Sequence, residues 1–566
     1  MNQNDIKKDV LNTLTNIVGK RYVLTNEAAT RAYRKGFRFG EGKVLAVVQP
    51  ANLLQQWNLL KACHAANIIV IMQAANTGLT GGSTPDGDDY DREIVILNTL
   101  RMNTIQVIKQ GQQVICLPGA TLDRLEKTLA PLGREPHSVI GSSCIGASVI
   151  GGVCNNSGGA LVHRGPAYTE MSIFACVNAA GELQLVNHLG IQLGNTPEEI
   201  LAKLEQGVYS EADILMDAGA GSDHHYVEQV RKIDADTPAR FNADPQRLHE
   251  AAGCAGKLII FAVRLDTFPI EKNTTVFYVG TNDPTEFSAI RSHILRDFTH
   301  LPIAGEYLHR DAFDVAEKYG KDAFLLINIL GTKKLPALFK LQSRFNALFD
   351  RLKIFPNNMS DRIMQACSKL FPNHLPSRMK EYRNRFEHYL MLRISAAGLH
   401  EARDFLKNYF AQASGDYFEC NSAEGEKAFL HRFVTAGAAV RMRAVCGKKF
   451  GGLVALDIAL KRNEKAWVEK LPPEIEQALA KKIYYAHFFC HVFHQDYLLK
   501  PGYDPIEIEH KMWHVLDQRG AEYPAEHNVG HLYHAKPNLQ HFYRELDPHN
   551  CFNPGIGQTS KLKNWT

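Results

Sequence analysis

Several features are missing from this sequence of 566 residues, and each absence narrows its class. No run of about 18 apolar residues occurs, so no transmembrane helix is expected. The first 20 residues lack the apolar region of a signal peptide. The eleven cysteines are scattered, odd in number and without a Cys-x-x-Cys pair, which favours a reduced cytosolic interior over a disulfide framework. The length is too great for one core and indicates two or three domains.

The common phosphate-binding motifs are absent too, although one stretch is built for close approach of the backbone. Residues 68–91, IIVIMQAANTGLTGGSTPDGDDYD, begin as a buried strand and break into a glycine-rich turn. No lysine follows its glycines as in a P-loop, and they lack the Gly-x-Gly-x-x-Gly spacing of a Rossmann turn. Successive backbone N–H groups in such a turn suit a phosphate. An ordinary surface loop before the next strand, at 92–100, is the alternative.

A second surface of small residues follows within the next 90 residues. A strand at 113–117 and a helix with Thr121 as its N-cap precede two stretches rich in Gly, Ser and Ala, at 141–152 and 155–159. A sheet core has no need of so many small residues unless the backbone approaches something closely. Together the two surfaces indicate a large, extended ligand.

The charge of the chain is unevenly distributed. Residues 331–385 carry twelve Lys and Arg against three acids, a net charge of +9, whereas the rest of the chain sums to −5. Apolar residues at helical spacing run through this segment: Leu338, Leu341, Phe345, Leu348 and Leu352. A basic amphipathic helix of this kind is typical of a membrane interface. A solvated face, a core-facing stripe and a nucleic-acid site remain alternatives on composition alone.

Histidines gather near the C-terminus. Residues 484–499, YYAHFFCHVFHQDYLL, contain His487, His491 and His494, and the later AEHNVGH contains Glu526, His527 and His531. Imidazole and carboxylate ligands suit zinc or manganese. A histidine is also suited to act as a general base near neutral pH. Satisfied core histidines on a strand are the alternative for His487 and His494.

At this point the sequence resembles a known family. The stretches NTGLTGGS, PGATLDRLEKTL and IGASVIGGVCNNSGG resemble the FAD-binding domain shared by vanillyl-alcohol oxidase and p-cresol methylhydroxylase. GCAGKLIIFAVRLD and the C-terminal YPAEHNVGHLY and LDPHNCFNPGIG are similar to further elements of that superfamily. REPHSVIGSSCIGASVIGGVCNNSGG, GPAYTEMS and FHQDY resemble the respiratory, quinone-linked D-lactate dehydrogenases of bacterial membranes in particular.

The resemblance implies which residues bind the cofactor. The first loop would wrap the FAD pyrophosphate, the second would lie along the flavin and ribityl chain, and a strand near residue 260 would contribute backbone at the other end. The residues implied, in that order, are Ala74, Ala75, Asn76, Thr77, Gly78, Gly82 and Ser83, then Gly141, Ser148 and Gly158, and finally Ile260. Covalent members carry a histidine in the first loop, and because Asn76 and Thr77 stand there, the resemblance implies non-covalent FAD.

The resemblance also implies which residues form the reaction centre. Related 2-hydroxyacid dehydrogenases hold a divalent metal with two histidines seven residues apart and a later glutamate, and use the next histidine as base. His487, His494, Glu526 and His527 match that order, although FFCHVF replaces the Gly-Asp-Gly-Asn of those relatives, which puts the metal in question. Arg393 in LMLRISAAG is the candidate for binding the substrate carboxylate, with an ordinary surface ion pair as the alternative.

The resulting prediction is an α+β flavoenzyme. Residues 1–266 would form a two-subdomain FAD-binding domain of the vanillyl-alcohol oxidase and p-cresol methylhydroxylase type, to which residues 518–566 return. Residues 267–517 would form a mixed α/β cap, interrupted by a basic, mainly helical membrane-binding insertion at 309–385, with 424–449 as a further patch. The implied activity is oxidation of D-lactate to pyruvate, with electrons passed to membrane quinone.

The implied location is the cytoplasmic face of the bacterial inner membrane, held peripherally by anionic phospholipid, without nucleic acid as a partner. Two rival functions remain at this point. One is a dehydrogenase of another D-2-hydroxy acid, such as 2-hydroxyglutarate or glycolate, with a soluble electron acceptor. The other is a membrane- or nucleic-acid-binding protein in which the FAD site is vestigial.

Overall fold

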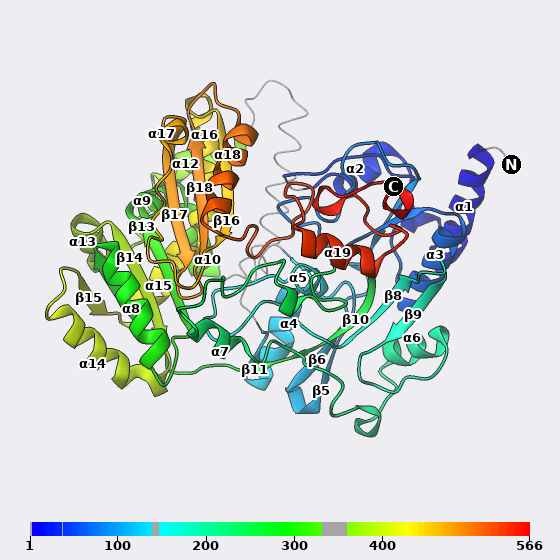
Figure 1. Cartoon of the computed structure of the whole chain (residues 1–566), viewed down its shortest axis with the longest axis horizontal. Helices are drawn as coiled ribbons and strands as arrows, with labels where there is room; N and C mark the ends of the chain where they lie inside the picture. Colours follow the sequence, from blue (N-terminus) through cyan, green and yellow to red (C-terminus); the bar gives the residue numbers. More distant parts are fainter. Residues whose placement is uncertain (1–2, 37, 138–145, 331–358) are drawn as a thin grey trace.

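The computed structural model describes residues 3–36, 38–137, 146–330 and 359–566, which form two regions side by side (Figure 1). Strands between residues 23 and 266 make a four-stranded and a five-stranded sheet. Strands between residues 275 and 499 make a seven-stranded sheet. This division into sheets and helices is the α+β class predicted.

The four-stranded sheet has the order β1-β2-β4-β3, and β2 and β3 both run parallel to β4. Its elements are β1 (Val23–Leu24), β2 (Ala46–Val48), β3 (Ile69–Gln73) and β4 (Ile94–Asn98), with α1 (Gln3–Val18), α2 (Glu27–Arg34) and α3 (Leu53–Ala65). β3 and β4 are almost wholly buried, as their β-branched sequences predict for parallel strands. Their carboxyl ends share one edge, from which the glycine-rich loop starts.

The five-stranded sheet has the order β5-β6-β10-β8-β9. Its strands are β5 (Ile105–Ile108), β6 (Gln113–Cys116), β8 (Ser172–Val177), β9 (Leu183–Asn187) and β10 (Ile259–Asp266). They are accompanied by α4 (Leu122–Leu129), α5 (Val149–Cys154), α6 (Pro197–Gln206) and the ribbon of β7 (Arg134–Glu135) with β11 (Phe268–Pro269). The next helix in the chain, α7 (Tyr226–Arg231), packs instead in the core of the seven-stranded sheet. The predicted N-cap is confirmed, because the Thr121 hydroxyl accepts the N–H of Arg124. Ser148 caps α5 in the same way.

The seven-stranded sheet is antiparallel throughout, in the order β15-β12-β14-β13-β17-β18-β16. The strands are β12 (Thr275–Thr281), β13 (Ala304–His309), β14 (His388–Ile394), β15 (Asp416–Glu419), β16 (Gly452–Ala459), β17 (Leu479–His487) and β18 (Val492–Leu499). The accompanying helices are α8 (Pro284–Asp297), α9 (Arg310–Tyr319), α10 (Lys321–Leu330), α12 (Met359–Ser368), α13 (Ser377–Arg385), α14 (Leu399–Phe410), α15 (Ser422–Phe433), α16 (Thr435–Cys446), α17 (Pro473–Glu476) and α18 (Pro505–Gln518).

The C-terminal segment lies against the first region, where α19 (Pro537–Leu546, red) is drawn beside α5 in Figure 1. Phe552 forms a parallel bridge with Val70 of β3, and the Asn553 N–H donates to the Val70 carbonyl at 3.0 Å. These contacts accord with the expected return of the tail. The domain boundaries themselves stay predictions.

The predicted membrane-binding insertion is described only in part, because residues 331–358, including the whole apolar stripe, lie outside the described residues. Its first helix, α9, buries Phe313 and Ala316 in one core with residues of β12 and β14, such as Tyr278 and Tyr389. Among the described residues no helix combines the length and the apolar character needed to cross a bilayer.

Candidate active site

The glycine-rich loop after β3 presents its backbone to one side. None of the N–H groups from 75 to 83 donates a hydrogen bond to a described residue. The loop is instead held by side chains: Asn98 donates to the Ala74 carbonyl at 2.9 Å, and Asn76, at φ +53°, donates to the Lys35 carbonyl at 2.8 Å. Ser83 donates to the Asn76 side chain at 3.2 Å. A fixed row of free N–H groups fits a diphosphate.

The loop is closed by the C-terminal segment. Gly82 packs so tightly on Asn528 that a Cβ there would lie 2.0 Å from Asn528 Nδ2. Thr80 donates to the Asn528 carbonyl at 2.8 Å, and Asn553 donates to the Gly82 carbonyl at 2.9 Å. Gly78, in contrast, is exposed, and a Cβ there would meet nothing within 4 Å. The loop therefore has one packed side and one open side.

The second predicted surface also meets the C-terminal segment. Gly158 lies against Glu526, and a Cβ on Gly158 would approach Glu526 Oε1 to 2.3 Å. Ile260 is buried in β10, where its carbonyl accepts the Gln56 amide at 3.2 Å. Asn155, at the end of α5, keeps a buried Oδ1 without a described partner, as a ligand-facing acceptor would. Gly141 lies outside the described residues.

His487, His494 and Glu526 lie together, although the first and the last are 39 positions apart in the sequence. Each offers one ligand atom, and these atoms all lie within 4.8 Å of one another. The two imidazole rings are 5.1 Å apart between centroids, and His487 Nε2 is 3.5 Å from Glu526 Oε2. Burial holds the pKa of His494 well below its usual value, so this imidazole is neutral, as a metal ligand must be. The set fits a divalent metal.

His527 is paired with Asp457, a residue of β16. Its Nδ1 lies 2.9 Å from Asp457 Oδ2, which also accepts the N–H groups of Glu526 at 2.7 Å and His527 at 3.2 Å. Burial disfavours the imidazolium, but the charge and hydrogen bond of Asp457 outweigh it and raise the pKa of His527. Because Nδ1 is engaged, Nε2 of this 40% exposed ring is left for another partner.

Two arginines neutralise the buried carboxylates of this cluster. Glu306 of β13 lies 2.7 Å from His487 Nδ1 through one oxygen and 3.0 Å from Arg432 through the other. Arg240 forms an ion pair with Glu526. Burial opposes the charge of Glu306, but His487 and Arg432 lower its pKa on balance. A buried carboxylate needs such partners to stay ionised.

Strand pairing explains how these groups meet. Glu306 is opposite His487 across β13 and β17, and Asp457 is opposite His494 across β16 and β18. Directly opposed residues share one face of an antiparallel sheet. Arg393 of β14 is opposite Ala304, which places it on the same face as Glu306, one strand away. Its guanidinium lies 4.2 Å above the Phe429 ring and its Nε has no described partner, so it is no surface ion pair.

The sequence analysis missed Arg240, Glu306, Arg432 and Asp457. The two acids carried a detectable signal, since each is a lone carboxylate in an apolar strand, AGEYLH or LVALDIAL. A charge at such a position must be paired in the folded protein. Arg240, in TPARFN, carried no such signal. Arg432, in AFLHRFV, was included in the predicted membrane-binding patch at 424–449, but it is buried and paired with Glu306 instead.

Comparison with known proteins decides the family. A family model described as "D-lactate dehydrogenase, membrane binding" matches residues 276–565, and an "FAD binding domain" model matches residues 44–186. The chain is 58% identical to the quinone-dependent D-lactate dehydrogenase of Haemophilus influenzae, over 99% of both chains, and 58% identical to that of Escherichia coli, over 99% of this chain and 98% of the relative. The chain is a member of the quinone-dependent D-lactate dehydrogenase family.

The fold prediction is confirmed by solved structures. The chain is similar to p-cresol methylhydroxylase with a TM-score of 0.59 and 13% identity, over 99% of this chain and 98% of that one. A 4-ethylphenol oxidase from Gulosibacter chungangensis gives a TM-score of 0.57, 12% identity and coverage of 98% and 97%. The chain thus has the predicted FAD-binding fold.

Proposed function

We propose that the protein oxidises D-lactate to pyruvate with non-covalent FAD and passes the electrons to a membrane quinone. The observation that carries the proposal is the contact of Gly158, on the predicted flavin surface, with Glu526, next to the His527–Asp457 pair. When bound, FAD supplies the acceptor for the hydride that leaves lactate C2. The chain's own residues bind and orient the hydroxy acid and move its hydroxyl proton.

His527 serves as the general base in this proposal. Asp457 fixes the ring through Nδ1, which leaves Nε2 to accept the proton from the lactate hydroxyl. The same carboxylate stabilises the imidazolium that results. An Asp–His pair of this kind fixes both the tautomer and the orientation of the base.

His487, His494 and Glu526 would hold a divalent metal beside the base. Glu306 engages His487 Nδ1, so His487 Nε2 faces Glu526 and the centre of the set. A metal there would act as a Lewis acid on the substrate oxygens. Arg393, on the same sheet face, is proposed to bind the lactate carboxylate, since its Nε is free of described partners.

The membrane surface is proposed to lie around the insertion. Large apolar residues are exposed on both sides of the segment that is not described, with Ile329 at 74% and Leu370 at 88% exposure. The +9 charge of residues 331–385 complements anionic phospholipid and the cytoplasmic leaflet of the inner membrane. We propose peripheral attachment there, with no role for nucleic acid.

The test is anaerobic reduction of the bound flavin. D-lactate should bleach the visible flavin band, whereas L-lactate, 2-hydroxyglutarate and glycolate should leave it unchanged at the same concentration. Bleaching by one of the other acids in preference to D-lactate would refute the assigned substrate. A flavin that none of these acids reduces would refute the reaction.

A further inference from the structure

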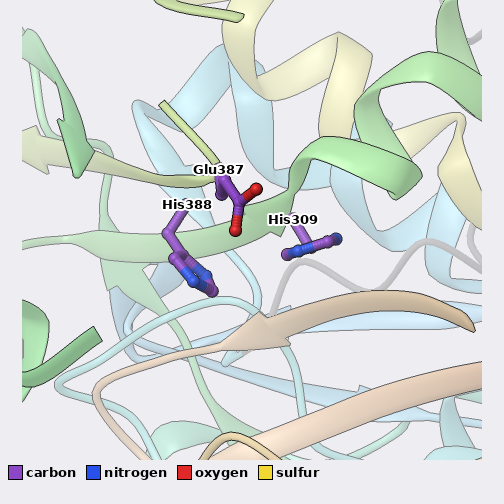
Figure 2. Close-up of side chains that lie close together, drawn as sticks. All are labelled: His309, Glu387 and His388. Atoms are coloured by element: carbon purple, nitrogen blue, oxygen red, sulfur yellow. The ribbon is translucent and has the colours of Figure 1, made fainter. Parts of the chain in front are cut away.

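A second group of histidine and glutamate side chains lies away from the reaction centre: His309, Glu387 and His388 (Figure 2). Each offers one ligand atom, and these atoms lie within 4.8 Å of one another. His309 and His388 are direct partners across β13 and β14, with ring centroids 5.3 Å apart. Because successive residues of a strand alternate in direction, His309 faces the side opposite to Glu306. The sheet therefore separates the two clusters.

We propose that His309, Glu387 and His388 form a divalent metal site of the zinc type, separate from the D-lactate reaction. Figure 2 shows the Glu387 carboxylate above and between the two imidazole rings, and the ligand atoms of the three side chains are close enough to share one ion. Two imidazoles and a carboxylate, with water as fourth ligand, are a common zinc set. Zinc is favoured over magnesium or calcium because those ions prefer oxygen ligands.

Neighbouring groups orient the rings for this role. The buried Tyr307 hydroxyl lies 2.8 Å from His388 Nδ1, which leaves Nε2 for the ion. His309 Nδ1 now accepts the Asp311 N–H at 3.2 Å. Metal binding at His309 Nε2 places the ring proton on Nδ1. The Asp311 carboxylate, 3.8 Å from Nδ1, is then the group that would accept a hydrogen bond from it.

Neither imidazole carries the second proton, and with it the positive charge, that a metal would have to displace. Burial lowers the pKa of His388 to about 3, and burial also lowers that of His309. Both are neutral at pH 7, as metal ligation requires.

The cation paired with Glu387 opposes the ion. Arg310, the first residue of α9, forms an ion pair with Glu387 and competes with the metal for the carboxylate. Removal of this arginine should therefore strengthen metal binding, whereas a purely structural cluster would show no such gain. Arg310 thus provides a variant with an effect opposite to that of ligand removal.

The experiment is a calorimetric titration of the chelator-treated, FAD-loaded protein with zinc. Glu387→Gln and His309→Gln should each remove one equivalent or weaken it at least tenfold, and Arg310→Gln should tighten that equivalent several-fold. His400→Gln is the matched control, because His400 is an exposed histidine paired with Asp404. It should bind zinc as the unaltered protein does.

The same test in a variant of the reaction centre distinguishes zinc bound at the two clusters. In His494→Gln, which lacks one ligand of the other cluster, Glu387→Gln should still remove one equivalent. Glu387 is 47% exposed, so its replacement should leave the fold intact, which the melting temperature without zinc will verify. Unchanged zinc stoichiometry and affinity in folded Glu387→Gln and His309→Gln would overturn the proposal.

Discussion

Replacement of Asp457 by asparagine tests the proposed general base most directly. The change keeps the side-chain shape but removes the charge 2.9 Å from His527 Nδ1. A hydrogen bond to a charged group is worth about 1.5–3 kcal/mol, and one pKa unit corresponds to about 1.4 kcal/mol. Because the His527 ring is 40% exposed, solvent screening favours the lower end. We therefore expect the replacement to lower the pKa of His527.

The consequence appears in the pH profile of kcat/KM for D-lactate. A base acts only when unprotonated, so the acid limb of the profile should move toward lower pH in Asp457→Asn. The rate on the plateau should fall by about 100- to 10,000-fold, since the base is weaker and its tautomer is no longer fixed. Stopped-flow reduction of the bound flavin measures both effects.

Asp496→Asn is the matched control. Asp496 is also a buried strand carboxylate, on β18, but its partner is the Tyr485 hydroxyl at 2.9 Å rather than His527. The acid limb of the kcat/KM profile of Asp496→Asn should lie at the same pH as that of the unaltered protein. If the limb of Asp457→Asn also stays in place while flavin content is normal, Asp457 does not set the pKa of the base and the assignment of His527 is refuted.

Three further outcomes follow from the structure. In Gly82→Ala the added Cβ would lie 2.0 Å from the Asn528 side chain, so the purified protein should lose most of its FAD. The ratio of flavin to protein absorbance measures this loss, and a normal flavin content would contradict the proposed role of this loop in binding FAD. Arg432→Met leaves the buried Glu306 carboxylate without its arginine, so it should lower the free energy of unfolding, measured with denaturant, by about 3–5 kcal/mol. A loss below about 1 kcal/mol would show that Glu306 does not depend on Arg432. His527 has a raised pKa in the folded protein, so its protonation adds stability below pH ~6.5, and this stability is lost as the pH rises through the pKa of the folded state. His527→Gln should therefore flatten the pH dependence of the unfolding free energy in that range. An unaltered pH dependence would contradict the raised pKa.

Local features of the fold were predictable from the sequence. The apolar, β-branched runs at β3 and β4, the Thr121 cap of α4 and the glycine-rich turn depend on residues close together in the chain. Their conformations are set by steric preference and short hydrogen bonds, which a sequence pattern records directly. The resemblance of the glycine loops extended this to the cofactor and the family.

The reaction centre depended on contacts that no local pattern records. Histidines 487 and 494 were visible as candidates, but only the pairing of β17 with β18 brings them to one face. Only the pairing with β13 and β16 adds Glu306 and Asp457, which set the charge and orientation of the imidazoles. By itself the sequence determined the local elements, the flavin loops and the kinds of group available for chemistry. The tertiary structure decided which buried carboxylate pairs with which imidazole, because strand register joins residues far apart in the chain and a buried charge is stable only beside its partner.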